Sequence, residues 1–209
     1  MSGARARVVK VGGSLFDHAS LADEIRRFLD KTPPAATVLL AGGGELCDVI
    51  RRHDRRYGLG EEAAHELCVR LLDVSARVLR ELLPEAHFAA DWRALEHCVR
   101  EHVATPLVFS PVQFLAECEP HLPGRRLPRD WTTTTDSIAA RLAESLAADL
   151  VLLKSASPPA GTLAELAAAR YVDRQFPLAA ASLPRVTLVN LRNPDLPTSI
   201  REIRPSRGC

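Results

Sequence analysis

Short runs of β-branched residues and leucine alternate along the chain with longer segments whose apolar residues recur every three or four positions. The short runs predict strands, and the longer segments predict amphipathic helices. Strands are expected at 7–11, 36–41, 86–90, 106–111, 150–155 and 185–190. Helices are expected at 21–30, 46–58, 61–82, 92–102, 137–148 and 163–170.

Strands separated by helices predict an α/β fold, a three-layer α/β/α sandwich around a mostly parallel sheet. No linker or repeat divides the 209 residues, so we expect a single domain over 1–209. Ligands of such sheets bind beyond the carboxyl ends of the strands. The strand exits are therefore where chemistry is expected.

Composition narrows the class of protein. The chain is 46% hydrophobic and 25% charged with a net charge of +1, which makes no case for nucleic acid or a membrane surface as a partner. Arginine-rich runs at 51–56 and 124–129 are interpreted as solvated faces. The five cysteines have no CxxC spacing, and the N-terminus resembles no signal peptide. We therefore expect a cytoplasmic protein with reduced thiols and no metal cluster.

The first strand exit reads KVGGS. Lys10 lies inside the strand, with its side chain opposite to those of Val9 and Val11. Gly12, Gly13 and Ser14 follow, where bare backbone amides and a nearby ammonium suit an anion. A simple tight turn after an edge strand is the alternative.

The second exit reads LLAGGGE. The three glycines Gly42, Gly43 and Gly44 stand between a buried strand and a helix. They suit a ligand that approaches the backbone and a helix N-terminus, where negative charge is favoured. The pattern is neither GxGxxG nor a P-loop, and a tight connection explains one glycine better than three.

The third exit has two parts. The run TTTTDS precedes a helix, with Asp136 or Thr135 as its expected N-cap, and the strand LVLLKS ends on Lys154. Asp136 could be only a cap. However, the only other lysine besides Lys10 and Lys154 is Lys31, so two strand-associated lysines in a lysine-poor chain favour a functional role.

Two lysines, two glycine-rich turns and one carboxylate between them make an anion site suited to phosphoryl transfer. That reaction asks a protein mainly to position two anionic groups and to offset the charge on the moving phosphoryl group. The carboxylate would hold both ammonium groups in place and keep them protonated.

The motifs KVGGSL, LLAGGGE and TTDSIAARLAESLAADLVLLKS occur in an order that resembles the amino acid kinase superfamily, which includes acetylglutamate, aspartate, carbamate and uridylate kinases. The resemblance implies a carbamate kinase-like fold, ATP with Mg²⁺ as cofactors, a small-molecule acceptor and a homo-oligomer. Within the superfamily, the chain looks most like a short branch that includes an aminomethylfuran phosphate kinase of methanofuran biosynthesis.

The resemblance also implies roles for individual residues. Catalysis would fall to Lys10, Asp136 and Lys154. The acceptor would lie at Gly42, Gly43, Gly44 and His65. Phosphate and nucleotide contacts would come from Gly12, Gly13, Ser14, Thr135, Ser155, Tyr171 and Asp173.

The segment after Lys154 departs from the superfamily, since SASPPAG replaces its DGV. Three functions therefore stay open. The first is an ATP-dependent kinase that phosphorylates a phosphate or carboxylate oxygen, with an aminomethylfuran phosphate as the sharper expectation. The others are a uridylate-kinase-like enzyme and a non-catalytic nucleotide- or anion-binding module of the same fold.

Overall fold

The computed structural model describes residues 6–193 and 200–204. The strands are β1 (Arg7–Val11), β2 (Thr37–Ala41), β3 (His87–Ala89), β4 (Leu107–Phe109), β5 (Asp149–Lys154), β6 (Val186–Asn190) and β7 (Ile200–Ile203). The α-helices are α1 (Leu21–Lys31), α2 (Gly44–Tyr57), α3 (Glu61–Leu82), α4 (Trp92–Arg100), α5 (Thr135–Ser145), α6 (Leu163–Ala168) and α7 (Phe176–Ala179). Short helical turns are η1 (Gly13–Leu15), η2 (Phe114–Cys118) and η3 (Glu119–His121).

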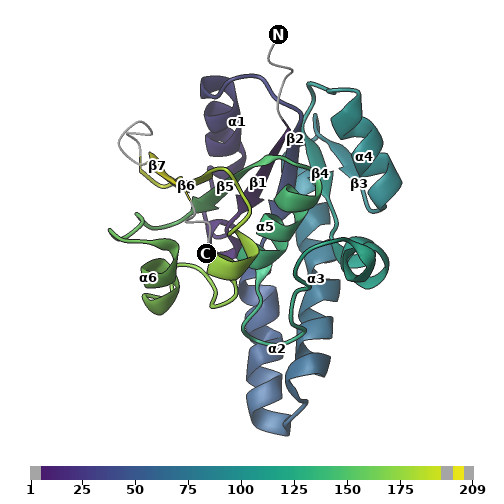
Figure 1. Cartoon of the computed structure of the whole chain (residues 1–209), viewed down its shortest axis with the longest axis vertical. Coiled ribbons are helices and arrows are strands. Elements are labelled where there is room, and N and C mark those ends of the chain that lie inside the picture. The colour runs from purple at the N-terminus through teal and green to yellow at the C-terminus, as the bar shows by residue number, and fades with distance from the viewer. Residues whose placement is uncertain (1–5, 194–199, 205–209) are drawn as a thin grey trace.

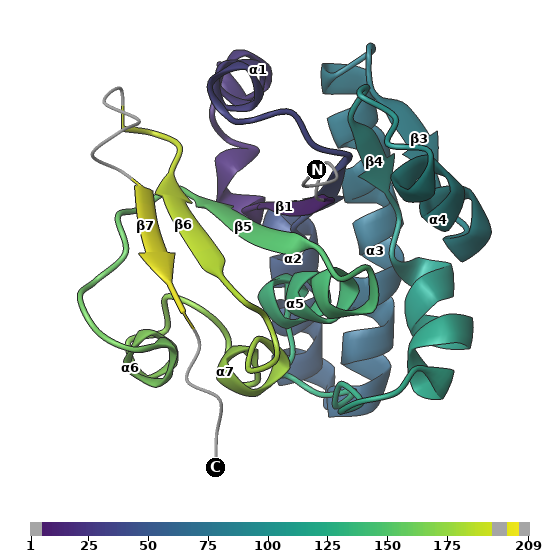
Figure 2. The ribbon, with the colours of Figure 1, turned by 45° about the horizontal axis from the view of Figure 1, so that its top comes forward.

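These strands form one sheet of seven in the order β3-β4-β2-β1-β5-β6-β7. Every neighbouring pair is parallel except β6 and β7, which are antiparallel. Helices cover both faces: Figure 2 shows α1 on one side of β5 and β6, and α5, α6 and α7 on the other. The predicted three-layer, mostly parallel α/β fold is confirmed.

Two hydrophobic clusters lie on opposite faces of the sheet, because side chains alternate along each strand. Val9 and Val11 of β1 belong to the cluster that packs under α1. Val8 belongs to the cluster that packs under α5 and α7. Lys10 follows Val8 in the alternation and therefore faces the α5 side, opposite to Val9 and Val11 as the sequence predicted.

Helices α2 and α3 form an antiparallel pair that extends beyond the sheet in Figure 1. Gly58, in the left-handed conformation at φ +62°, ends α2 and permits the sharp reversal. The predicted bounds of α3 match the structure. No helix among the described residues is long and apolar enough to span a bilayer.

Strand order brings the three predicted exits together. Strand β1 lies between β2 and β5, so the carboxyl ends of all three meet at one edge. The amide of Gly12 donates to the Leu153 carbonyl at 2.8 Å, and the amide of Gly42 donates to the Val11 carbonyl at 2.8 Å. The turn after β1 is therefore hydrogen-bonded to β5, and the turn after β2 is hydrogen-bonded to β1.

Candidate active site

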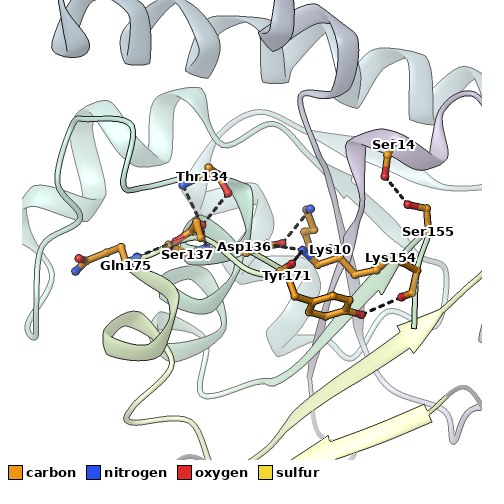
Figure 3. Close-up of polar contacts among 11 residues, drawn as sticks. Lys10, Ser14, Thr134, Asp136, Ser137, Lys154, Ser155, Tyr171 and Gln175 are labelled. Atoms are coloured by element: carbon orange, nitrogen blue, oxygen red, sulfur yellow. Dashed lines mark hydrogen bonds and ion pairs between the residues drawn. The ribbon is translucent and has the colours of Figure 1, made fainter. Parts of the chain in front are cut away.

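A buried carboxylate joins the two lysines at this edge (Figure 3). Lys10 Nζ lies 3.0 Å from Asp136 Oδ1, and Lys154 Nζ lies 2.6 Å from Asp136 Oδ2. Lys10 and Asp136 are 5% and 4% exposed, so water screens this trio very little. The three residues come from the second position of α5 and from neighbouring strands, β1 and β5.

The charges of these three side chains shift the pKa values of Asp136 and Lys10. Burial by itself raises the pKa of the Asp136 carboxyl, but the ammonium groups of Lys10 and Lys154 outweigh burial and lower the pKa to about 2. Burial lowers the pKa of Lys10; the charge of Asp136 opposes this shift and that of Lys154 adds to it. Counted by formal charge, the trio sets two cationic side chains against one carboxylate.

Lys154 has a second anchor besides Asp136. Its Nζ donates to the backbone carbonyl of Tyr171 at 2.7 Å and lies 5.2 Å from the centre of the Tyr171 ring. The Tyr171 hydroxyl in turn donates to the carbonyl of Ala156 at 3.2 Å. The segment around Tyr171 therefore fixes both Lys154 and the loop that follows β5.

The glycine turns pack directly against each other. A Cβ atom added to Gly13 would lie 2.2 Å from the backbone nitrogen of Gly44, and one added to Gly42 would lie 2.5 Å from that of Gly13. At Gly43 it would lie 2.1 Å from Cys47 Sγ, and Gly44 has φ +50°. Loop packing thus requires these glycines in addition to any demand from a ligand.

The start of α5 differs from the expectation. The N-cap is Thr134, whose side chain makes no capping bond, and Asp136 lies inside the helix. Asp173 caps the helix instead: its Oδ2 accepts from Thr134 Oγ1 at 2.7 Å and from the amides of Thr134 and Ser137 at 3.0 and 3.1 Å. The predicted cap at Asp136 or Thr135 was wrong, because a residue distant in sequence supplies the acceptor and leaves Asp136 for the lysines.

A cavity of about 860 Å³ opens over this edge of the sheet. Its described lining carries five cationic side chains against two carboxylates, an excess that suits anionic ligands. The cations are Lys10, Arg51, Lys154, Arg170 and Arg174, and the carboxylates are Asp136 and Asp173.

The cavity brings together most of the site residues predicted from the sequence. Those that line it are Lys10, Gly13, Ser14, Gly43, Gly44, His65, Thr135, Asp136, Lys154, Tyr171 and Asp173. Gly12 and Gly42 hold the turns to the strands instead, and Ser155 forms a hydrogen bond with Ser14 Oγ at 2.8 Å.

Sequence reasoning missed Arg51 and Trp131, which also line the cavity. The Arg51 guanidinium lies 5.3 Å from the centre of the Trp131 ring, and Trp131 Nε1 donates to Asp54 Oδ2 at 2.9 Å. Arg51 is therefore more than part of a solvated arginine run. The available signal was a tryptophan directly before the threonine run.

Among residues 6–193 and 200–204, no group of three or more His, Cys, Asp or Glu side chains is placed to hold a metal ion. Both oxygens of Asp136 face ammonium groups, and the Asp173 carboxylate faces the start of α5.

The fold is similar to that of two solved amino acid kinases. Uridylate kinase from Archaeoglobus fulgidus superposes with a TM-score of 0.50 at 18% identity, over 73% of this chain and 64% of that one. Aspartate kinase from Synechocystis superposes with a TM-score of 0.59 at 16% identity, over 99% of this chain and 41% of that one. The chain thus spans less than two thirds of either, and the likeness is one of fold.

One curated protein carries a sequence similarity. The [5-(aminomethyl)furan-3-yl]methyl phosphate kinase of Methanocaldococcus jannaschii is 29% identical over 76 residues, which are 36% of this chain and 35% of that protein. No protein-family model matches the chain. The resemblance to amino acid kinases seen in the sequence is thereby supported by one relative in sequence and by two in fold.

Proposed function

We propose that the protein is an ATP-dependent phosphotransferase that transfers the γ-phosphoryl group to an anionic oxygen of a small molecule. One observation carries the proposal: Asp136 bridges Lys10 and Lys154 at the floor of a cationic cavity. A preorganised excess of positive charge in a buried place stabilises charge that develops on a phosphoryl group.

The residues present fit ATP with magnesium. The nucleotide supplies the phosphoryl group, and its magnesium ion offsets phosphate charge. Lys10 and Lys154 hold ammonium groups at the exits of adjacent strands, fixed in place by Asp136. Gly13 and Ser14 begin the turn η1, where the first backbone amides have no acceptor inside the turn and therefore suit a phosphate oxygen.

An anionic acceptor fits the fact that, among the described residues that line the cavity, neither carboxylate is free to act as a base. Asp136 is committed to the lysines and Asp173 to the start of α5. A phosphate or carboxylate oxygen is already a nucleophile and needs no proton removed. Arg51 and the turn at Gly43 and Gly44 lie on the wall where such an acceptor would enter.

Among acceptors, an aminomethylfuran phosphate is the first choice, because a kinase for such a compound is the relative found by sequence. Uridine monophosphate (UMP) is the second choice, supported by the fold of uridylate kinase. The sequence of the loop 155–161 differs from that of the superfamily, and this difference favours the alternative function, a non-catalytic binding module.

Calorimetric titration with Mg-ATP tests the donor half of the proposal. The variants are Lys154→Ala and, as a matched control, Lys31→Ala, which removes the exposed lysine at the end of α1. Wild type and Lys31→Ala should bind Mg-ATP saturably, and Lys154→Ala should bind at least about tenfold more weakly, since a charge-assisted contact contributes about 1.5–3 kcal/mol.

Turnover with the two organic phosphates tests the acceptor half. ATP-dependent phosphorylation of either compound supports the kinase. Absence of Mg-ATP binding at millimolar concentration contradicts the proposal, whereas saturable binding without turnover of any anionic acceptor favours the binding module.

A further inference from the structure

Two cysteines face each other across the helix pair α2 and α3 (Figure 1). Cys47 Sγ lies 3.7 Å from the carbonyl oxygen of Cys68, and Cys68 Sγ lies 3.9 Å from the carbonyl oxygen of Cys47. The two thiols also form a hydrogen bond with each other. Both are free thiols, so the fold holds a dithiol in place between the two helices.

This cysteine pair lies in the wall of the cavity. Both residues line it; Cys47 is only 5% exposed, whereas Cys68 is partly exposed. Cys47 Sγ also packs on the second glycine turn, since a Cβ atom added to Gly43 would lie 2.1 Å from it. A chemical change at this sulfur therefore acts directly on the turn that begins α2.

The two thiols differ in reactivity. Their mutual hydrogen bond is the main cause that raises the pKa of Cys47, and burial adds to it. The same hydrogen bond lowers the pKa of Cys68; burial opposes this shift, and the charge of Arg51 supports it. The thiolate is the reactive form of cysteine. Cys68 is therefore expected to react first, and it is also the thiol that a small molecule in the cavity can reach.

We propose that Cys47 and Cys68 are a site of reversible oxidation, at which a disulfide joins α2 to α3 and slows turnover. The oxidant is a small-molecule disulfide such as oxidised glutathione. The Cys68 thiolate attacks one sulfur of the oxidant, which forms a mixed disulfide on Cys68 and releases the first small thiol. Cys47 then loses its proton and attacks Cys68 Sγ, which forms the protein disulfide and releases the second small thiol. Two protein thiols are thus oxidised, one small-molecule disulfide is reduced, and the two protons end on the released thiols.

Such a disulfide acts on the turn at Gly43. A covalent bond between the sulfurs is shorter than the hydrogen bond that it replaces, so the start of α2 is drawn toward α3. Phosphoryl transfer depends on positioning, and a displacement of about 1 Å can cost about 10²-fold in rate. Lys154 and Tyr171 lie on other elements, so Mg-ATP binding should change less than turnover. The effect on turnover rests on the proposed function, whereas the oxidation itself does not.

Peptide mapping of the protein in glutathione buffers tests the oxidation. Trypsin cleaves between the two cysteines and releases Cys47 in peptide 32–51 and Cys68 in peptide 57–70, each with no other cysteine. With oxidised glutathione in excess, mass spectrometry should find these two peptides linked. Reduced glutathione in excess should separate them again.

Single variants test the role of each thiol. Cys47→Ser removes the second thiol, so a glutathione adduct should remain on peptide 57–70. Cys68→Ser should show neither the link nor an adduct on peptide 32–51. Cys118→Ser is the matched control and should form the link as wild type does, because Cys118 does not line the cavity, and burial and neighbouring carboxylates raise its pKa.

Turnover in the same two buffers tests the effect on function, with UMP and the aminomethylfuran phosphate as acceptors. The kcat/KM of wild type and of Cys118→Ser should fall at least about tenfold in the oxidising buffer and recover in the reducing one. The kcat/KM of Cys68→Ser should be the same in both buffers. Calorimetric titration of oxidised and reduced wild type compares the Kd for Mg-ATP.

Absence of the linked peptides from oxidised wild type overturns the inference. Linked peptides with an equal kcat/KM in both buffers overturn the effect on turnover, while the kinase stands. Failure of reduced wild type to bind Mg-ATP removes the proposed function and the effect on turnover, and linked peptides then still support the site of oxidation.

Discussion

Replacing Lys10 with methionine should separate stability from activity. Lys10 and Asp136 are buried, Lys154 is partly buried beside them, and burial lowers the pKa of Lys10. Without Lys10, Asp136 and Lys154 remain as a neutral pair at 2.6 Å. The free energy of unfolding of Lys10→Met should therefore change by less than about 2 kcal/mol, because the substitution removes a charge whose burial is unfavourable but also one of the two counter-ions of Asp136.

Asp136→Asn should lower the free energy of unfolding, because it leaves the buried Lys10 and the partly buried Lys154 without their shared counter-ion. A pKa of about 2 against an ordinary 3.8 corresponds to about 2–3 kcal/mol of stability at neutral pH. Breaking a buried pair typically costs about 3–5 kcal/mol, so a loss of about 2–5 kcal/mol is expected. Asp23→Asn is the control: Asp23 is 74% exposed, and its ion pair with Arg26 should contribute less than about 1 kcal/mol.

Urea unfolding at neutral pH, followed by circular dichroism, measures these changes. Turnover of the same variants completes the test: Lys10→Met should lose about 10²–10³-fold in kcat, as when one preorganised contact to the transition state is removed. The reasoning is refuted if Lys10→Met loses more than about 2 kcal/mol of stability or if Asp136→Asn is as stable as wild type.

Two further changes test the electrostatics and the glycine packing. The stability difference between wild type and Asp136→Asn should be fully present above about pH 4 and should vanish as the pH falls through about 2, because Asp136 takes up its proton at a higher pH in the unfolded chain than in the folded one. Urea unfolding at several pH values measures this difference, and a difference that stays constant with pH would contradict the low pKa assigned to Asp136. Gly13→Ala should lower the free energy of unfolding by about 1–3 kcal/mol or more, because the added Cβ would lie 2.2 Å from the backbone nitrogen of Gly44. Gly58→Ala has open space around the added Cβ, so it should lower the free energy of unfolding by only about 1–2 kcal/mol, the cost of its φ of +62°. Calorimetric Tm values compare the two, and equal losses would argue against the loop contact.

Local pattern was enough to predict several features of the protein. Alternating side chains placed Lys10 on the face opposite to Val9 and Val11, and the helical period of 61–82 predicted α3 with its bounds. The exits of three strands were visible because a buried run that ends in glycine or lysine breaks the pattern locally. These features depend only on residues close together in the chain.

Pairings between distant residues decided the rest. Ser14 meets Ser155 and Asp173 caps α5 only because the sheet sets β1 beside β5 and the 171–175 segment beside Thr134. The contact between Gly13 and Gly44 arises in the same way. No local period encodes such a contact, since its energy is gained only when the whole sheet is assembled.

The sequence by itself therefore determined the fold class, the strand exits and the charged residues that stand at them. Only the tertiary structure placed Asp136 between Lys10 and Lys154, drew Arg51 over Trp131 and set Cys47 against Cys68. The physical reason is that residue types and periods are local properties. Distances, burial and the resulting pKa values depend on which distant segments the fold packs together.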